Sequence, residues 1–363
     1  MKVLLAYTND AEKDNPFVKT LKDGLGRLGC DIHWGLEEFW MNYAKYEVIH
    51  INWPNSLFET GKPTKTEVIF LERIIKEIKE KSIKIVYTRH NETPHYSTDA
   101  NTLKCYQIIE QNADAIVHLG NYGIKEFMEI TKCKHFIIPH HIYDSIYSNN
   151  ITLKEARSKL GIPQNKFVFL TFGVYRDREE VDLVLAAYKR IKIKNKLLLA
   201  PRLKAHFGFS KRPASRSIRT WLRYIYVEGI KFIKRKLEFR KHSIFALNDF
   251  VSDNDLPLYF LAANVVLIQR TKILNSGNLP MAYYFKKMVI GPNVGNVGEI
   301  LSETNNIAFE TNSNESFVNA LKLSHTIAKD EIEVNNYNYA MRFWNTDRIA
   351  RKYLDVYQEL KYG

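Results

Sequence analysis

The sequence predicts an α/β protein made of two doubly wound, Rossmann-like domains that face each other across a cleft. The chain has 363 residues, about twice the ~150–180 residues of a single domain. Short β-rich runs alternate with amphipathic stretches, which is typical of a parallel sheet covered by helices. The alternation stops in a polar stretch at 149–165 and then begins again. Two domains, 1–148 and 149–344, are therefore expected.

In the first domain, five β-rich runs are the expected strands, and four amphipathic stretches are the expected helices. The runs are rich in Val, Ile and aromatic residues, which favour strands, whereas the helical stretches repeat apolar residues every three or four positions. The expected strands lie at 3–7, 48–52, 83–88, 115–119 and 136–139, and the expected helices at 17–28, 66–81, 98–112 and 122–131.

The second domain repeats this order, and a last helix follows it. The expected strands lie at 167–172, 197–200, 244–247, 265–268 and 288–291, and the expected helices at 178–193, 256–263, 277–286 and 316–328. At 347–360, apolar and aromatic residues alternate with Arg348 and Arg351, which predicts the final helix.

Composition excludes several classes of protein. Hydrophobic residues make up 45% and charged residues 26%, a balance that excludes wholesale disorder. The longest apolar runs are far shorter than the roughly 20 residues that cross a bilayer. The run at 1–7 ends at Thr8-Asn9-Asp10, so it is not a signal peptide. Cys30, Cys105 and Cys133 lack metal-site spacing, which fits a reducing cytoplasm.

Positive charge is concentrated in one segment. Between Pro201 and His242, thirteen Lys or Arg residues face only Glu228 and Glu238, so this segment carries +11 of the net +13. Such a field indicates a polyanionic partner, either anionic lipid or nucleic acid.

The same segment predicts a basic amphipathic helix inserted in the second domain. Six apolar residues fall on one helical face around Gly229, and basic residues lie opposite. This pattern favours contact between 202–241 and an anionic membrane surface. Packing of the helix on its own domain is the main alternative, and nucleic acid is unlikely because no zinc, helix-turn-helix or RNP-like pattern accompanies the charge. The apolar residues are Ile218, Trp221, Leu222, Ile225, Phe232 and Ile233.

Polar and aromatic clusters follow three expected strands of the first domain. Carboxyl ends of parallel strands meet at one edge of a sheet, where ligands bind, so these clusters are expected to converge. In the second domain, Arg270 precedes an Asn-Ser-Gly turn that leads into a helix, an arrangement that can hold a diphosphate but is also ordinary turn chemistry. The first-domain clusters are His50 and Trp53, then His90, Asn91 and His95, then His140.

The order of these motifs resembles the GT-B glycosyltransferases of bacterial capsule and exopolysaccharide assembly, particularly the mannosyltransferase-like group. The resemblance runs from about residue 3 to residue 299. It rests on His50-Ile51-Asn52-Trp53-Pro54, Thr88-Arg89-His90-Asn91, Pro94-His95, Pro139-His140, Phe172-Gly173-Val174-Tyr175-Arg176, Asn275-Ser276-Gly277 and Pro292-Asn293-Val294-Gly295-Asn296-Val297-Gly298-Glu299.

The resemblance implies an N-terminal acceptor domain, which residues 345–363 would complete, and a C-terminal nucleotide-sugar domain. It places Arg176, Arg202, Arg270, Asn275, Ser276, Gly277 and Glu299 at the donor. It places His50, Trp53, Asn91, His95 and His140 at the acceptor, with His90 near the anomeric carbon.

The sequence also departs from the family pattern. Glu179-Glu180 stand where Lys-Gly is usual, which weakens phosphate binding at that loop unless Arg178 compensates. Met281 stands where the second Glu of the large retaining families would fall. The stereochemical outcome therefore stays open.

The chemistry expected is transfer of a sugar from a UDP- or GDP-linked donor to a lipid-linked or oligosaccharide acceptor in surface polysaccharide synthesis. Arg and helix-terminal N–H groups can stabilise the leaving group, and the sequence has no Asp-x-Asp triplet, so neither a metal nor another cofactor is expected. His90 is the expected general base of an inverting route, with Glu92 and His95 as alternatives.

The expected location is the inner face of the cell membrane, on its cytoplasmic side. Competing interpretations keep the fold and change the function: a nucleotide-sugar epimerase, a transferase acting on DNA, or a non-catalytic carbohydrate- or membrane-binding module.

Overall fold

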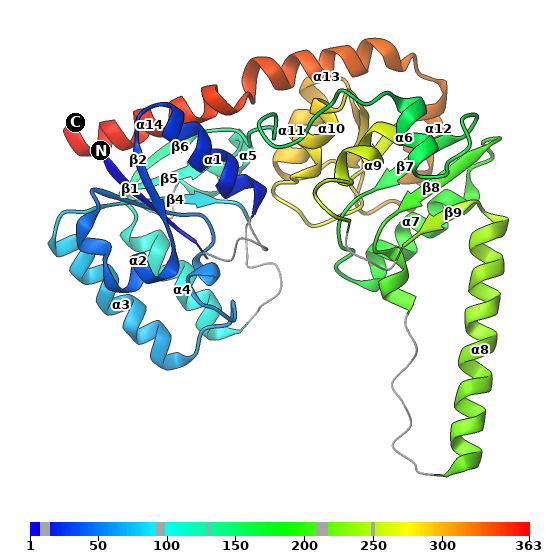
Figure 1. The fold of residues 1–363 in the computed structure, drawn as a ribbon, viewed down its shortest axis with the longest axis horizontal. Coiled ribbons are helices and arrows are strands. Elements are labelled where there is room, and N and C mark those ends of the chain that lie inside the picture. The colour runs from blue at the N-terminus through cyan, green and yellow to red at the C-terminus, as the bar shows by residue number, and fades with distance from the viewer. Residues whose placement is uncertain (8–14, 92–98, 129–130, 208–216, 248–250) are drawn as a thin grey trace.

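The structure is a computed structural model that describes residues 1–7, 15–91, 99–128, 131–207, 217–247 and 251–363. It contains two six-stranded sheets, each parallel throughout and packed between helices (Figure 1). The strand order is β2-β1-β3-β4-β5-β6 in the first sheet and β12-β11-β10-β7-β8-β9 in the second. The predicted fold class, two Rossmann-like α/β units with a basic helical insertion in the second, is confirmed.

The first sheet and its helices come from the N-terminal half of the chain. The strands are β1 (Lys2–Ala6), β2 (Asp31–Trp34), β3 (Val48–Ile51), β4 (Lys84–Arg89), β5 (Ala115–His118) and β6 (Lys134–Ile137). The helices are α1 (Pro16–Arg27), α2 (Leu36–Met41), α3 (Lys65–Glu80), α4 (Ala100–Asn112) and α5 (Asn121–Phe127), with short 3₁₀ turns η2 (Tyr43–Lys45) and η3 (Pro54–Leu57).

The second sheet follows a link that ends at α6 (Leu153–Lys159). Its strands are β7 (Phe167–Thr171), β8 (Lys196–Ala200), β9 (Ile244–Ala246), β10 (Val265–Leu267), β11 (Met288–Pro292) and β12 (Ile307–Phe309). The helices are α7 (Arg178–Arg190), the turn η4 (Leu203–Phe207), α8 (Ile218–Lys241), α9 (Leu256–Ala262), α10 (Asn278–Tyr284), α11 (Gly295–Glu303), α12 (Asn314–Thr326), α13 (Lys329–Phe343) and α14 (Thr346–Tyr362).

Local chemistry explains where the helices begin. Thr64 and Glu67 form a reciprocal capping box at the start of α3, and Asp99 accepts two backbone N–H bonds at the start of α4. The central strands β1, β3, β4 and β5 are buried on both faces, as continuous Val and Ile runs require in a parallel sheet.

The last helix, α14, packs against α1 and the first sheet, so the two ends of the chain lie close together (Figure 1). The two helices meet at Gly24. A Cβ atom on Gly24 would lie only 2.8 Å from the Ala350 Cβ, so glycine permits this close approach. Tyr353 and Tyr357 of α14 are fully buried, which makes this helix part of the first core.

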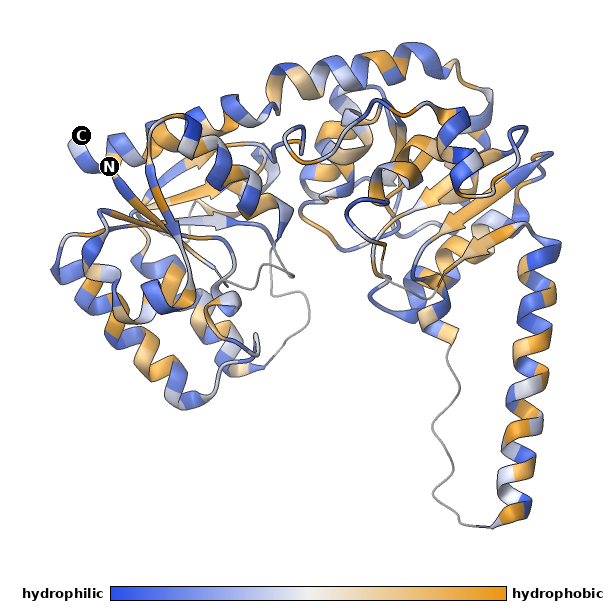
Figure 2. Cartoon of the chain, in the orientation of Figure 1, coloured by the Kyte–Doolittle hydropathy of each residue, from blue (hydrophilic) through white to orange (hydrophobic). Residues whose placement is uncertain are grey.

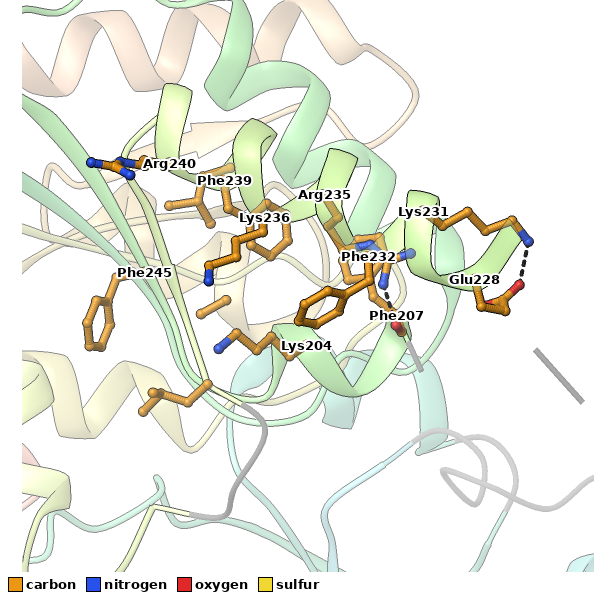
Figure 3. Close-up of a pocket in the computed structure, with 13 residues that line it drawn as sticks. Lys204, Phe207, Glu228, Lys231, Phe232, Arg235, Lys236, Phe239, Arg240 and Phe245 are labelled. Carbon is orange, nitrogen blue, oxygen red and sulfur yellow. Dashed lines mark hydrogen bonds and ion pairs between the residues drawn. The ribbon is translucent and has the colours of Figure 1, made fainter. Parts of the chain in front are cut away.

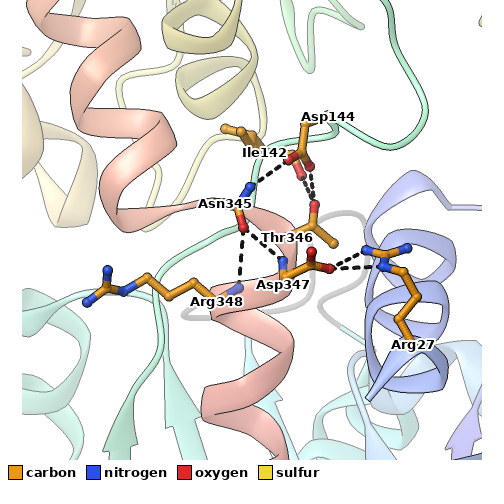
Figure 4. A network of polar contacts seen from close by, with 7 residues as sticks. All are labelled: Arg27, Ile142, Asp144, Asn345, Thr346, Asp347 and Arg348. Carbon is orange, nitrogen blue, oxygen red and sulfur yellow. Dashed lines mark hydrogen bonds and ion pairs between the residues drawn. The ribbon is translucent and has the colours of Figure 1, made fainter. Parts of the chain in front are cut away.

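Polar contacts fix the start of α14 (Figure 4). The Asn345 Nδ2 donates to Asp144 Oδ2 at 2.9 Å, and the Thr346 hydroxyl donates to the Ile142 carbonyl at 3.3 Å and to the Asp144 carboxylate. The Arg27 guanidinium donates twice to Asp347 Oδ1, at 2.9 and 2.6 Å. These bonds tie the final helix to both the interdomain link and α1.

Helix α8 is the element that packs least closely on its domain. It is a continuous 24-residue helix that passes through Gly229 and extends away from the second sheet (Figure 1). Only Glu228 and Phe239 are buried within it. Packing on its own domain therefore does not cover its apolar residues (Figure 2). None of the helices in the described ranges is long and apolar enough to cross a bilayer.

Candidate functional site

An aromatic cluster surrounds His90 where β3 and β4 end. The His90 ring stacks on Trp53 at a centroid distance of 4.1 Å and meets the edge of Phe17 at 4.6 Å. Its Nε2 lies 3.1 Å from the Asn52 side-chain oxygen. An amide oxygen accepts hydrogen bonds, so the His90 Nε2–H donates to Asn52 in this contact. The ring is buried and held in one orientation.

Phe17 contacts one member of each of the three predicted clusters. Its ring centroid lies 4.9 Å from that of His140 and 4.4 Å from that of His141, in addition to its contacts with His90 and Trp53. The sequence analysis did not select Phe17, because it lies at the start of a helix and not at a strand end. Its position after Pro16, next to the first strand, was the available signal.

His140 lies where the N-terminal and C-terminal halves meet, a region called the seam below. Its Nδ1 donates to the His141 carbonyl at 2.7 Å, and its Nε2 is 3.4 Å from the Tyr143 hydroxyl. A Cβ placed on Gly277 would lie 3.8 Å from His140 Nε2. The structure therefore places His140 beside the Asn-Ser-Gly turn of the second half.

A chain of amide groups crosses the seam. Asn275 Nδ2 donates to the His90 carbonyl at 2.9 Å, and Asn296 Nδ2 donates to Asn275 Oδ1 at 2.7 Å. Asn296 Oδ1 accepts from the Gly123 N–H at 3.2 Å. These bonds bring the carboxyl ends of the two sheets together. Asn296 was not selected from the sequence.

Glu299 also bridges the two halves. Its Oε2 accepts from the N–H groups of Asn121 and Tyr122, at 3.1 and 3.2 Å, at the start of α5. A carboxylate at a helix N-terminus is favourable because it offsets the helix dipole. In this arrangement Glu299 caps a helix of the opposite half, although the sequence analysis assigned it to the donor.

His50 lies in the core of the first half. It is fully buried in β3, with Nδ1 2.7 Å from the Tyr357 hydroxyl and Nε2 2.8 Å from the Thr88 hydroxyl. Both ring nitrogens are thus engaged with α14 and β4. This geometry gives His50 a structural role, so we leave it out of the proposed site.

Two loops of the second half are linked by arginines. Arg176 follows β7 and donates to the Lys272 carbonyl at 3.1 Å, whereas Arg270 follows β10 and donates to the Val174 carbonyl at 3.3 Å. Because β7 and β10 are adjacent strands, these two hydrogen bonds place both guanidinium groups at the carboxyl end of the second sheet. Arg202 follows β8 at the same edge, with φ of 71°, a backbone conformation that usually favours glycine.

The two acids that depart from the family pattern have different roles. Glu180 Oε2 accepts from the Arg176 N–H at 2.9 Å, and the Glu180 N–H donates to Asp177 at the start of α7. Burial raises the pKa of Glu180, and the bond from Arg176 and the charge of Arg270 oppose that rise. Glu180 therefore organises the β7 loop, while Glu179 is exposed.

The remaining predicted residues are placed as follows. Asn91 and Ser276 are buried, and they follow His90 and Asn275 in the sequence. Gly277 precedes α10. Glu92 and His95 lie outside the described residues. Within the described ranges, no group of three or more His, Cys, Asp or Glu side chains has the geometry of a metal site.

Buried histidines near the site predict acid sensitivity. Burial lowers the pKa of His50 to about 3 and that of His140 to about 4, whereas an unfolded histidine titrates near ~6.5. The unfolded chain thus binds more protons in acid, so stability is full above about pH 6.5 and is lost as the pH falls toward 4. His50→Gln should reduce the loss of unfolding free energy between about pH 7.5 and about pH 5.5 by about 1.4 kcal/mol.

Urea unfolding at the two pH values measures this difference, with the partly exposed His33→Gln as the matched control. An unchanged pH dependence in His50→Gln would show that His50 does not contribute.

Comparison with known proteins supports the fold and gives no closer relationship. No family model and no curated protein sequence matches the chain. Sucrose-phosphate synthase from Thermosynechococcus elongatus is similar in structure, with a TM-score of 0.67, 14% identity and 99% of each chain covered.

Two further solved structures show the same likeness. Anabaena Alr3699/HepE in complex with UDP-glucose has a TM-score of 0.67 at 12% identity, covering 99% of this chain and 100% of HepE. The UDP-forming trehalose-phosphate synthase from Burkholderia xenovorans has a TM-score of 0.61 at 10% identity, covering 100% and 99%. With two parallel six-stranded sheets whose carboxyl ends meet at His90 and Asn275, the chain has the GT-B fold.

Proposed function

We propose that the protein is a glycosyltransferase that uses a nucleotide-diphosphate sugar, either UDP- or GDP-linked. The observation that carries this proposal is the pair Arg176 and Arg270, which follow the adjacent strands β7 and β10 at the carboxyl end of the second sheet. Guanidinium groups bind phosphate oxygens with charge-assisted hydrogen bonds. The likeness to HepE, solved with UDP and with UDP-glucose, supports the same class of donor.

The residues at the seam support the following division of roles. Arg176, Arg202 and Arg270 would hold the diphosphate and offset its charge as the bond from the sugar to the β-phosphate oxygen breaks. The acceptor hydroxyl would attack the anomeric carbon and give its proton to the His90 imidazole in an inverting route. The nucleoside diphosphate then leaves. No metal is assigned to the reaction in this proposal.

The acceptor we propose is a lipid-linked sugar or oligosaccharide of surface polysaccharide synthesis, at the inner face of the cell membrane. Two features support it. Trp53, which is only partly buried beside His90, offers an aromatic ring of the kind that packs against sugar rings. The segment 202–241 has a net charge of +11, and its helix α8 is largely exposed, which suits an anionic membrane surface.

Replacing Arg270 with Ala should weaken nucleotide-diphosphate binding by about 1.5–3 kcal/mol, the range for a hydrogen bond to a charged group. Titration calorimetry with UDP and GDP measures the change. Arg73→Ala is the matched control, because Arg73 lies on the surface of α3 and pairs with Glu77.

Unchanged affinity in Arg270→Ala would remove Arg270 from the donor site. Failure of the unaltered protein to bind any nucleoside diphosphate would contradict the proposed function and favour a non-catalytic module.

A further inference from the structure

The outer face of α8 carries an apolar stripe that nothing in the described structure covers. Six side chains form this stripe and fall within an arc of about 120° when residues advance by about 100° each. Their exposed fractions range from 53% to 78%. Figure 2 shows most of the helix extending away from the second half of the chain. The apolar stripe consists of Ile218, Leu222, Ile225, Tyr226, Phe232 and Ile233.

One edge of the apolar stripe is basic. Arg219, Arg223 and Lys234 are exposed and fall beside it on the same side of the helix. Within Ile218–Lys241, eight Lys or Arg residues face two Glu residues, a net charge of +6. An exposed apolar stripe with a basic border matches the boundary between lipid headgroups and acyl chains.

A groove lies next to this surface, at the C-terminal end of α8, which is its foot (Figure 3). The groove has a volume of about 760 Å³, and Phe207, Phe232 and Phe239 line it. Lys236 lies one turn beyond Phe232, and its side chain extends toward that of Lys204 from η4 (Figure 3). Among the described residues, neither amine has an acidic partner, so the groove offers two unneutralised cations above aromatic rings.

Arg235 holds the foot of the helix in place. Its guanidinium donates to the Phe207 carbonyl and lies 4.4 Å from the Phe207 ring centroid. Arg235 is therefore a structural residue of the groove, unlike the exposed basic residues beside the apolar stripe.

Charge selects among the molecules that could cover the apolar stripe. A second copy of α8 would bring a second +6 helix against the first, and this like-charge contact is unfavourable. Nucleic acid would match the charge but would leave Ile218, Ile225 and Ile233 against water or phosphate. An anionic bilayer matches both the charge and the apolar stripe of α8, because its headgroups bind the Lys and Arg side chains and its acyl region contacts the apolar ones.

We infer that α8 and the groove at its foot form a docking site for anionic membrane lipid. The apolar stripe lies on the bilayer, the basic border contacts headgroup phosphates, and Lys204 and Lys236 hold a headgroup over the aromatic rings of the groove. This inference deepens the proposed function, on which it rests only for the location of the acceptor. The docking itself follows from α8.

Vesicle sedimentation of the full chain tests the docking, with three triple variants. The border variant is Arg219→Glu, Arg223→Glu and Lys234→Glu, and the stripe variant is Ile218→Gln, Ile225→Gln and Ile233→Gln. The control variant, Lys65→Glu, Lys104→Glu and Lys154→Glu, makes the same change in net charge at exposed positions on other helices. Circular dichroism checks that each variant is folded.

We expect the unaltered protein to sediment with vesicles that contain phosphatidylglycerol and not with phosphatidylcholine alone at about 0.15 M salt. Each basic side chain near an anionic surface is worth about fivefold in partitioning, so the border variant should lose roughly 100-fold. The stripe variant should also lose binding, and the control variant should bind within about twofold of the unaltered protein.

Three results would overturn the inference: equal recovery with neutral and anionic vesicles, equal losses in the border and control variants, or a dimer in sedimentation velocity that only the stripe variant abolishes. Titration with UDP and GDP separates the two proposals. Docking can fail while nucleotide binding is retained, and nucleotide binding can fail while docking is retained.

Discussion

Replacing His90 with Ala should lower turnover by roughly 10²–10⁴-fold, the usual contribution of a general base. The ring lies between Trp53 and Phe17 with Nε2 on Asn52, so it is held in a single position. The bond from Asn275 goes to the His90 carbonyl oxygen and survives the substitution. Donor affinity should therefore stay unchanged while turnover falls. Steady-state rates at saturating donor and calorimetry with the nucleotide measure the two quantities.

The partly exposed His33 is the matched control, because it lies in the edge strand β2, where its ring contacts Asp31 and Tyr46. His33→Ala should retain the turnover of the unaltered protein. Turnover within a few-fold of normal in His90→Ala would end the assignment, and would leave Glu92, His95 or a route without a base.

Deleting residues 345–363 should unfold the N-terminal half while the C-terminal half stays folded. Burial of one large apolar side chain contributes about 1.5–3 kcal/mol. Helix α14 buries several, so their summed contribution is comparable to the ~5–15 kcal/mol that stabilises a whole domain. The side chains lost are Ile349, Tyr353, Leu354, Val356 and Tyr357. Hydrogen exchange compared between β1–β6 and β7–β12 measures the outcome.

Point variants in the full chain separate packing from polar contact. Tyr357→Phe removes only the bond to His50 and should cost about 1 kcal/mol, whereas Tyr357→Ala should cost about 3–5 kcal/mol. Normal exchange protection of the first sheet in the truncated chain would contradict the role given to α14. The predicted boundaries at 148 and 344 stay a prediction until this is measured.

Much of the fold could be predicted because most strands are buried and consist mainly of apolar residues. The runs at 48–52 and 115–119 became β3 and β5 within one residue at their ends. Strand β2 was missed because Asp-Ile-His-Trp has two polar residues and is half exposed, unlike the buried four-residue strands β3 and β5. Strand β12 has three residues, with the middle one exposed. Strands this short gain most of their stability from the neighbouring strand, which local sequence does not reveal.

The site was less predictable because its side chains depend on contacts between distant parts of the chain. His50 and His90 both end or follow a β-rich run, and the sequence treated them alike. Helix α14 packs back on the first sheet and brings the Tyr357 hydroxyl, 307 positions later, into contact with His50. This contact engages the His50 ring within the core, so His50 does not face a ligand. Glu299 lies beside the site, but its carboxylate caps α5, which the sequence could not place opposite it.

The position of α14 also sets an order of events during synthesis. The N-terminal half lacks its last core helix until residue 362 has been made, although its own strands are complete at Ile137. At about 5–20 residues per second, roughly 200 further residues take about 10–40 s. Throughout that time the surfaces of α1 and β3 that α14 covers are open to other chains and to chaperones. The core elements of the C-terminal half, from β7 to α13, all follow one another in the chain, so this half is under no such delay.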